Sequence, residues 1–247
     1  MDMGFNQKPI DLVVDEICAF PWTSLSSDDM VDVAWAYYFF SIQFRESLGE
    51  ARRLYPTDVS LQKIEAEECD TSNLSPWPGV AAVGERMNHD EFMRRTLALM
   101  SFAPARVATH EAIGRRYLAA THALEPEIRA ASLVSYEDGG LERVFRSILT
   151  FTQWDSDLLR AFRHFLSEHV RFDSDSEQGH GALCRHLAYD DRILPLWQGF
   201  RDLLLQAVPA LASRAWLPVA GVPSERIPET ADAKSSRKLT NQVGADF

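Results

Sequence analysis

The sequence feature that most constrains the fold is a long helical pattern that runs from about residue 28 to residue 54. The polar residues Ser26, Ser27 and Asp28 are typical of a helix N-cap, and Pro56 stops the pattern. Its apolar residues occupy nearly every side of the helix, and many are aromatic: Trp35, Tyr37, Tyr38, Phe39, Phe40 and Phe44. A helix that is apolar all round is buried, so we expect this segment to lie inside the fold.

The remainder of the chain continues the helical pattern, interrupted mainly by proline and glycine. Strand patterns are scarce, and no internal repeat is visible. Further helices are expected at residues 59–69, 89–101, 109–122, 127–138 with a continuation at 141–152, 158–172, 181–188 and 193–212. The sequence therefore predicts an all-α fold, a bundle of about seven helices.

Three regions of the chain differ in character. Residues 1–27 are mixed in composition and form an N-terminal segment with one short helix, and residues 28–212 form the helical bundle domain. Towards the C-terminus the sequence turns polar and rich in Pro, Ser and Lys, without periodicity. We expect residues 213–247 to be a disordered tail.

Composition limits the classes of partner. The formal net charge is −11 at pH 7, whereas nucleic acids and anionic membranes are bound through basic surfaces. We therefore expect neither as the main partner, and a small molecule instead. A homodimer is compatible with such a bundle, although no seam in the sequence shows one.

Cysteine usage and the N-terminus bear on location. Cys18, Cys69 and Cys184 are widely spaced and form no CxxC pair, so they suggest neither a disulfide framework nor a zinc knuckle. The chain begins without the basic and apolar regions of a signal peptide, and no apolar run is long enough to cross a membrane. These features predict a cytoplasmic protein.

The richest group of chemically active residues lies between Ser167 and His180. His169 and Asp173 are four residues apart, so they share one face of a helix. His180 follows three helical turns after His169 and returns to nearly the same face. Imidazole and carboxylate together suit Fe(II) and leave coordination positions open for oxygen.

Three earlier residues complete a candidate metal site. Glu68 ends one expected helix and His89 begins the next, so the loop between them can bring the two side chains together. Glu137 follows an apolar helical run and precedes a Gly139-Gly140 break. Taken singly, each residue also fits a plainer role, such as a solvated helix end or a helix cap. Helical di-iron proteins use about four carboxylates and two histidines from several helices, which this set approaches.

A family resemblance supports the metal hypothesis. His169-x3-Asp173 followed by Gly179-His180-Gly181 resembles the closing motif of the haem-oxygenase-like di-iron oxidases and oxygenases. The resemblance spans roughly residues 34–207. It is closest to an uncharacterised subgroup with a His-x3-Asp motif followed by His-Gly.

The upstream residues resemble the other ligand motifs of that superfamily. Glu67-Glu68 together with Asn88-His89 resembles its first ligand pair, and Glu137 stands in the place of its lone glutamate. The resemblance implies a haem-oxygenase-like bundle that binds two Fe(II) per chain, uses O2 as co-substrate and needs no catalytic residue beyond the ligands. Those ligands would be Glu68, His89, Glu137, His169, Asp173 and His180.

The resemblance also implies the kind of reaction. The substrate would be a small amino-acid-like or carboxylate-bearing molecule of specialised metabolism, which undergoes N-oxygenation or oxidative C–C or C–N cleavage. The aromatic cluster is expected mainly in the core, with Tyr37 and Tyr38 available to line a substrate pocket. Among the arginines, Arg94, Arg95, Arg163 and Arg171 are candidates to pair with a substrate carboxylate.

Two alternatives stay open from the sequence. Six residues separate Asp173 from His180, where the superfamily has two or three, so Asp175 or Glu177 can replace Asp173 as the ligand. The bundle is also compatible with a metal-free thiaminase-like hydrolase or a small-molecule-binding protein, which would rely on an apolar cavity and on Cys184.

Overall fold

The computed structural model describes residues 8–68, 76–173 and 191–214, which belong to one compact unit, Met1–Trp216. The described residues contain α-helices, short 3-10 and π turns, and one isolated bridge between Trp77 and Ala81. The α-helices are α1 (Pro9–Cys18), α2 (Ser27–Leu54), α3 (Val59–Glu68), α4 (His89–Leu97), α5 (Pro104–His122), α6 (Pro126–Ser135), α7 (Leu141–Ile148), α8 (Asp157–Asp173), α10 (Leu194–Ala207) and α11 (Pro209–Arg214). The all-α prediction is confirmed, and the described residues alone hold ten α-helices where about seven were expected.

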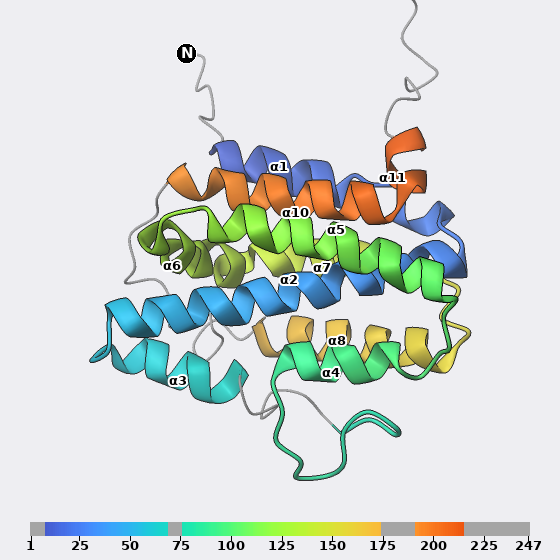
Figure 1. Cartoon of the computed structure of the whole chain (residues 1–247), viewed down its shortest axis with the longest axis horizontal. Coiled ribbons are helices and arrows are strands. Elements are labelled where there is room, and N and C mark those ends of the chain that lie inside the picture. The colour runs from blue at the N-terminus through green and yellow to red at the C-terminus, as the bar shows by residue number, and fades with distance from the viewer. Residues whose placement is uncertain (1–7, 69–75, 174–190, 215–247) are drawn as a thin grey trace, which may run out of the picture. The chain divides into compact units, whose positions relative to one another are not determined.

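Helix α2 is the centre of this unit. It packs against α3, α4 and α8 on one side and against α5, α6 and α10 on the other (Figure 1). The outermost layer contains α1, which contacts α7 and α10. The prediction of a buried helix at residues 28–54 is therefore confirmed, since α2 has helices on both sides.

The start of α2 has a clear local cause. Ser26 adopts an extended conformation, and its hydroxyl accepts a hydrogen bond from the Asp29 N–H at 3.1 Å. The Asp29 carboxylate in turn accepts one from the Ser26 N–H at 2.9 Å. This reciprocal capping box satisfies two backbone N–H groups that lack partners within the helix.

Several helix boundaries differ from expectation, and proline explains most of them. Pro104 and Pro126 occupy the first turns of α5 and α6, where the missing N–H costs nothing, so α5 begins five residues earlier than expected. The helix expected at 193–212 is divided at Val208, before Pro209. The helix expected at 181–188 lies outside the described residues.

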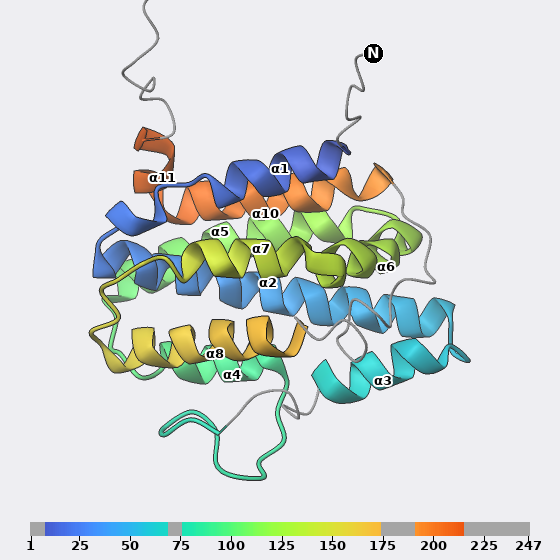
Figure 2. The same cartoon turned by 180° about the vertical axis from the view of Figure 1, so that it is seen from behind.

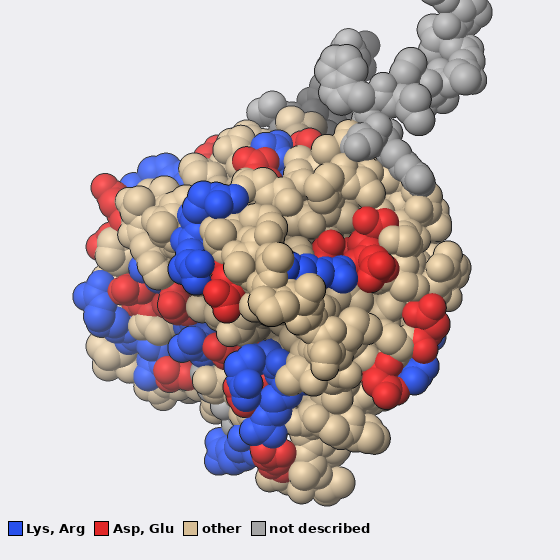
Figure 3. All heavy atoms as spheres, turned by 45° about the vertical axis from the view of Figure 1, so that its right-hand side comes forward, with Lys and Arg blue, Asp and Glu red and all other residues tan. Residues whose placement is uncertain are grey.

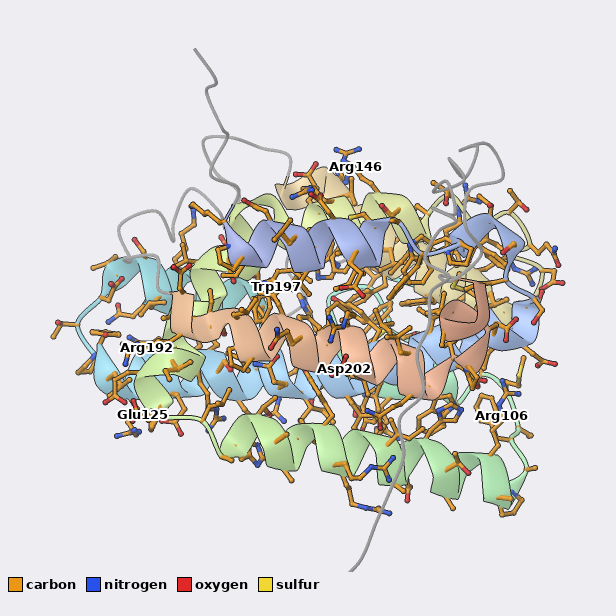
Figure 4. All side chains as sticks on the ribbon, turned by 90° about the horizontal axis from the view of Figure 1, so that it is seen from above. Arg106, Glu125, Arg146, Arg192, Trp197 and Asp202 are labelled. Atoms are coloured by element: carbon orange, nitrogen blue, oxygen red, sulfur yellow. The ribbon has the colours of Figure 1, made fainter. Side chains whose placement is uncertain are left out.

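Aromatic side chains fill the space around α2. The rings of Phe40 and Phe200 approach to 4.3 Å between centroids, and Tyr136 meets Trp197 at 5.0 Å. Trp197 lies on α10, and its indole N–H donates to the Ser135 hydroxyl at 2.9 Å (Figure 4). These contacts join α2, α6 and α10 into one core.

Ion pairs tie the helices together at both ends of this unit. At one end Arg192 lies 3.8 Å from Glu125, and at the other Arg106 on α5 lies 2.6 Å from Asp32 on α2 (Figure 4). The Arg192–Glu125 pair is exposed and the Arg106–Asp32 pair is partly buried. Exposed pairs contribute about 0–1 kcal/mol each, so the aromatic core dominates the stability.

Candidate metal centre

Three of the predicted ligands meet between the ends of three helices. Glu68 is the last residue of α3, His89 is the first of α4, and His169 lies near the end of α8. Helices α4 and α8 run side by side beneath α2, with the end of α3 close to them (Figure 2). One candidate ligand atom from each side chain lies within 4.8 Å of the other two.

The contacts within this cluster are short. The Nδ1 atom of His89 lies 2.6 Å from the Glu68 carboxylate and 3.3 Å from Nε2 of His169. Glu68 is 7% exposed, and the two histidines are 8% exposed. Buried carboxylates and imidazoles require compensating partners, so burying this cluster lowers the stability of the fold unless a partner such as a metal ion or a proton compensates its charge.

The protonation of His169 is fixed by its own helix. Its Nδ1 lies 2.8 Å from the carbonyl oxygen of Phe165, and because a carbonyl only accepts, Nδ1 carries the proton. The lone pair of Nε2 then points to the His89 side of the cluster. A second-sphere hydrogen bond of this kind orients a metal-binding histidine and raises its basicity.

Glu137 is brought to the same place by a break in helical geometry. Residues Tyr136–Gly140 form a π turn between α6 and α7, where the sequence predicted a break of the helix at Gly139-Gly140 and a local distortion. Gly139 has φ +86°, which suits glycine, and a Cβ on Gly140 would lie 2.3 Å from the Ser135 carbonyl oxygen. The glycine pair therefore permits the π turn, a feature that frequently occurs at functional sites.

A small cavity joins these residues. Its volume is about 30 Å³, above the roughly 10–15 Å³ that one buried water needs. Glu68, His89, Glu137 and His169 form its polar part. The remaining lining residues are mostly apolar: Tyr37, Phe40, Ser41, Phe44, Arg45, Asn88, Leu141 and Phe145.

Phenylalanine rings surround the histidines. Phe165 packs against His169 at 4.2 Å between centroids, and Phe145 meets the same imidazole edge-on at 5.8 Å. Phe165 also contacts His89 at 5.6 Å. An apolar shell of this kind keeps water away and strengthens electrostatic interactions inside it.

The geometry of the cluster fits a shared metal ion. Two donors about 2.1 Å from one ion lie about 3.0 Å apart when their bonds meet at a right angle. The two histidine nitrogens, 3.3 Å apart, are close to this separation, and the Glu68 oxygen, 2.6 Å from the His89 nitrogen, would need to be a few tenths of an ångström farther from it. Two imidazoles and one carboxylate are also the donor set of many non-haem Fe(II) sites.

Not every predicted ligand can be placed. Asp173 is the last residue of α8, one helical turn beyond His169, but its side chain is outside the described part of the structure. His180 and the alternatives Asp175 and Glu177 lie outside the described residues. Four of the six predicted ligands, Glu68, His89, Glu137 and His169, therefore line one buried cavity.

The two tyrosines predicted to bind substrate line different cavities. Tyr37 lines the cavity of the metal cluster, whereas Tyr38 lines a different cavity beside α4 and α5. Adjacent helical residues point about 100° apart, which explains the separation. Cys184 and Cys69 lie outside the described residues, and the described lining of the metal cavity contains no thiol.

Arg45 is a lining residue that the sequence analysis did not select. It lies on α2, four residues after Ser41 and eight after Tyr37, and this helical spacing places all three on one face. Its guanidinium contacts one oxygen of Asp90 at 3.1 Å. None of the four arginines favoured from the sequence lines this cavity: Arg94 and Arg95 pair with Glu91, and Arg171 pairs with Glu168. Arg163 is exposed on α8.

A buried polar network links the π turn to α2 and α5. The Gln43 side-chain oxygen accepts hydrogen bonds from the hydroxyls of Tyr117 at 3.2 Å and Tyr136 at 3.5 Å. Burial raises the pKa of both phenols. They therefore remain neutral donors, and Tyr136 connects this network to Glu137, the next residue in the chain.

The face of the molecule in Figure 3 carries no large patch of a single charge. Acidic and basic side chains lie interspersed on the face shown in Figure 3. Within the described residues, no helix combines the length and apolar character that a membrane crossing needs.

Comparison with protein-family models, with curated proteins and with solved structures found no match for this chain. Its class therefore rests on its own fold and site. In its described residues it is an all-helical protein with a buried group of one glutamate and two histidines, Glu68, His89 and His169, that can bind a metal ion.

Proposed function

We propose that this protein is a non-haem di-iron enzyme that uses O2 to oxidise or oxygenate a small amino-acid-like or carboxylate-bearing substrate. The observation that carries the proposal is the buried group of Glu68, His89 and His169, whose ligand atoms lie within 4.8 Å of one another. Glu137 on the wall of the same cavity supplies a second carboxylate. The resemblance of these residues to the haem-oxygenase-like di-iron proteins supports the same proposal.

The ligands divide between two ions in this proposal. Glu68, His89 and His169 would hold the first iron. Glu137 would either bridge the two irons or bind the second one alone. The second iron would be completed by Asp173, or by Asp175 or Glu177 in its place, and by His180. Iron bound there would supply the reduction of O2 and the oxidising power for the substrate.

The residues of this chain would do the remaining work. The Nδ1–H of His169 holds its imidazole in place through the Phe165 carbonyl, and the phenylalanine shell excludes water. Arg45 uses two of its nitrogens on a single Asp90 oxygen, so it retains donors for a substrate carboxylate. Arg45 is thus our candidate for orienting the acid group of the substrate.

Anaerobic titration of the purified, metal-free protein with Fe(II) tests the proposal. We expect uptake near two irons per chain, followed by a transient visible absorption after rapid mixing with O2. Uptake near one iron would contradict the di-iron part and favour a mononuclear site on Glu68, His89 and His169. The absence of tight uptake in a correctly folded bundle would refute the metal function altogether.

Matched histidine variants make the test specific. His89→Ala and His169→Ala should each lower Fe(II) affinity at least about tenfold, because each removes a direct ligand. His122→Ala is the control, since His122 lies on α5, pairs with Glu46 and has a side chain that is 46% exposed. Equal loss of affinity in the control would show that the effect is not local to the cluster.

One observation favours a second candidate, a metal-free enzyme. Glu68 and His89 form a 2.6 Å pair, and such a carboxylate–imidazole arrangement can act as a general base. A thiaminase-like hydrolase would need a nucleophile, and the sequence offers Cys184, which is outside the described residues. Activity that survives chelation and is abolished by thiol alkylation would select this candidate.

A further inference from the structure

A second and larger cavity lies beside α2, α4 and α5. Its volume is about 480 Å³, within the roughly 300–1,000 Å³ that is typical of small-molecule sites. It shares no described lining residue with the metal cavity. It therefore requires an explanation of its own.

The wall of this cavity is aromatic and held in place. Trp35 stacks face to face on His110, with 5.5 Å between centroids and 5° between planes, and meets the edge of Phe102 at 5.6 Å. His110 is itself fixed by Asp32 at 2.7 Å. Because these contacts leave the indole little freedom, the cavity offers a preformed surface for a flat ring.

The charges around the cavity are balanced. Arg94 makes two hydrogen bonds to Glu91, at 2.6 and 2.7 Å, and Arg115 pairs with Glu111 at 3.2 Å. Each lining cation thus has a counter-ion close by, and Glu91 also pairs with Arg95. A charged ligand would lose hydration without gaining an uncompensated partner, so the cavity favours an uncharged one.

Two donors among the lining residues make no hydrogen bond within the described part of the chain, the buried Trp35 indole N–H and the Tyr38 hydroxyl. Burial, followed by the nearby Asp90 carboxylate, raises the pKa of Tyr38, so the phenol stays protonated at neutral pH. It can therefore donate to an acceptor on a ligand.

We propose that this cavity is a second binding site, which takes an uncharged, flat aromatic molecule that carries one hydrogen-bond acceptor. Trp35, Phe39 and Phe102 pack against the ring, and Tyr38 donates to the acceptor. The proposal goes beyond the metal centre and does not depend on it.

Equilibrium dialysis of the full chain against three matched probes tests the proposal. The probes are 2-acetylnaphthalene, which is neutral with an acceptor, naphthalene, which has no acceptor, and 2-naphthoate, which is anionic. We expect saturable binding of 2-acetylnaphthalene at one site per chain and at least about tenfold weaker binding of 2-naphthoate. Tightest binding of the anion, or no saturable binding of any probe, would overturn the proposal.

Variants locate the site. Tyr38→Phe should weaken the binding of 2-acetylnaphthalene about fivefold and leave naphthalene unchanged, because only one hydrogen bond is lost. Val107→Trp fills the cavity and should abolish binding, whereas Leu12→Trp, at a position 56% exposed on α1, is the matched control. Circular dichroism checks the fold of each variant. Unchanged binding in both Tyr38→Phe and a folded Val107→Trp would show that the probes bind elsewhere.

Discussion

The close packing of Gly140 in the π turn that carries Glu137 predicts that alanine at this position destabilises the protein. This residue has ordinary helical angles, φ −63° and ψ −54°, so alanine is compatible with its backbone conformation. The added Cβ, however, would lie 2.3 Å from the Ser135 carbonyl oxygen and 2.7 Å from Cζ2 of Trp197. A normal carbon–oxygen contact is about 3.3 Å or longer, so the overlap is about 1 Å against backbone that cannot rotate away.

The magnitude follows from two opposing effects. Overpacking costs about 1–3 kcal/mol, and replacing glycine by alanine within a helix returns up to about 1 kcal/mol. Gly140→Ala should therefore lower the free energy of unfolding by about 1–2 kcal/mol. For a domain of this size, about 2–4 °C per kcal/mol gives a fall in melting temperature of about 2–8 °C.

A second glycine provides the control. Gly49 lies inside α2, is exposed, and an added Cβ there would have no neighbour within 4 Å. Gly49→Ala should therefore stabilise the protein by up to about 1 kcal/mol. Urea unfolding followed by circular dichroism measures both variants in one series. A Gly140→Ala protein as stable as the natural chain would refute the close approach and, with it, the structural reason for the glycine pair.

Three further predictions concern metal, pH and salt. If the cluster binds iron, Fe(II) at a free concentration of about 100 times its dissociation constant should raise the free energy of unfolding by about 2.7 kcal/mol, and a chelator should remove this gain. Urea unfolding with and without Fe(II) measures the difference. Burial raises the folded-state pKa of Tyr117 above its unfolded value, so its contribution to stability is complete below about pH 10 and is lost as the pH rises further. Tyr117→Phe should flatten that loss above about pH 10 in the same assay. Glu91, whose pKa is lowered to about 2 mainly by hydrogen bonds from Arg94 and then Arg95, is largely in solvent, so Glu91→Gln should cost only about 0–1 kcal/mol and less in high salt.

Much of the fold was predictable because its signals are local. The capping residues before α2, the proline after it and its aromatic composition identify a buried helix from sequence alone. The π turn at Tyr136–Gly140 was not predictable, because its geometry depends on packing against Trp197 as well as on the glycine pair. A distortion was expected there, but its form required the structure.

The candidate ligands were also predictable, for a different reason. Glu68 and His89 lie at the ends of consecutive helices, and His169 and Glu137 stand out as ionisable residues in apolar helical segments. Arg45 was missed because its relation to the site depends on which side of α2 faces α3 and α4. An all-round apolar helix gives no periodicity from which that side can be read.

The same property of α2 explains how one helix serves two cavities. Tyr37 and Tyr38 are adjacent in sequence, yet one lines the metal cavity and the other the aromatic cavity. A surface helix exposes one face and can contribute to one buried site only, whereas a central helix has partners on every side. The burial of α2 that stabilises the bundle therefore also allows two chemically different cavities to lie along a single element, one lined by the residues that can hold a metal, the other lined by aromatic side chains and by arginines paired with glutamates.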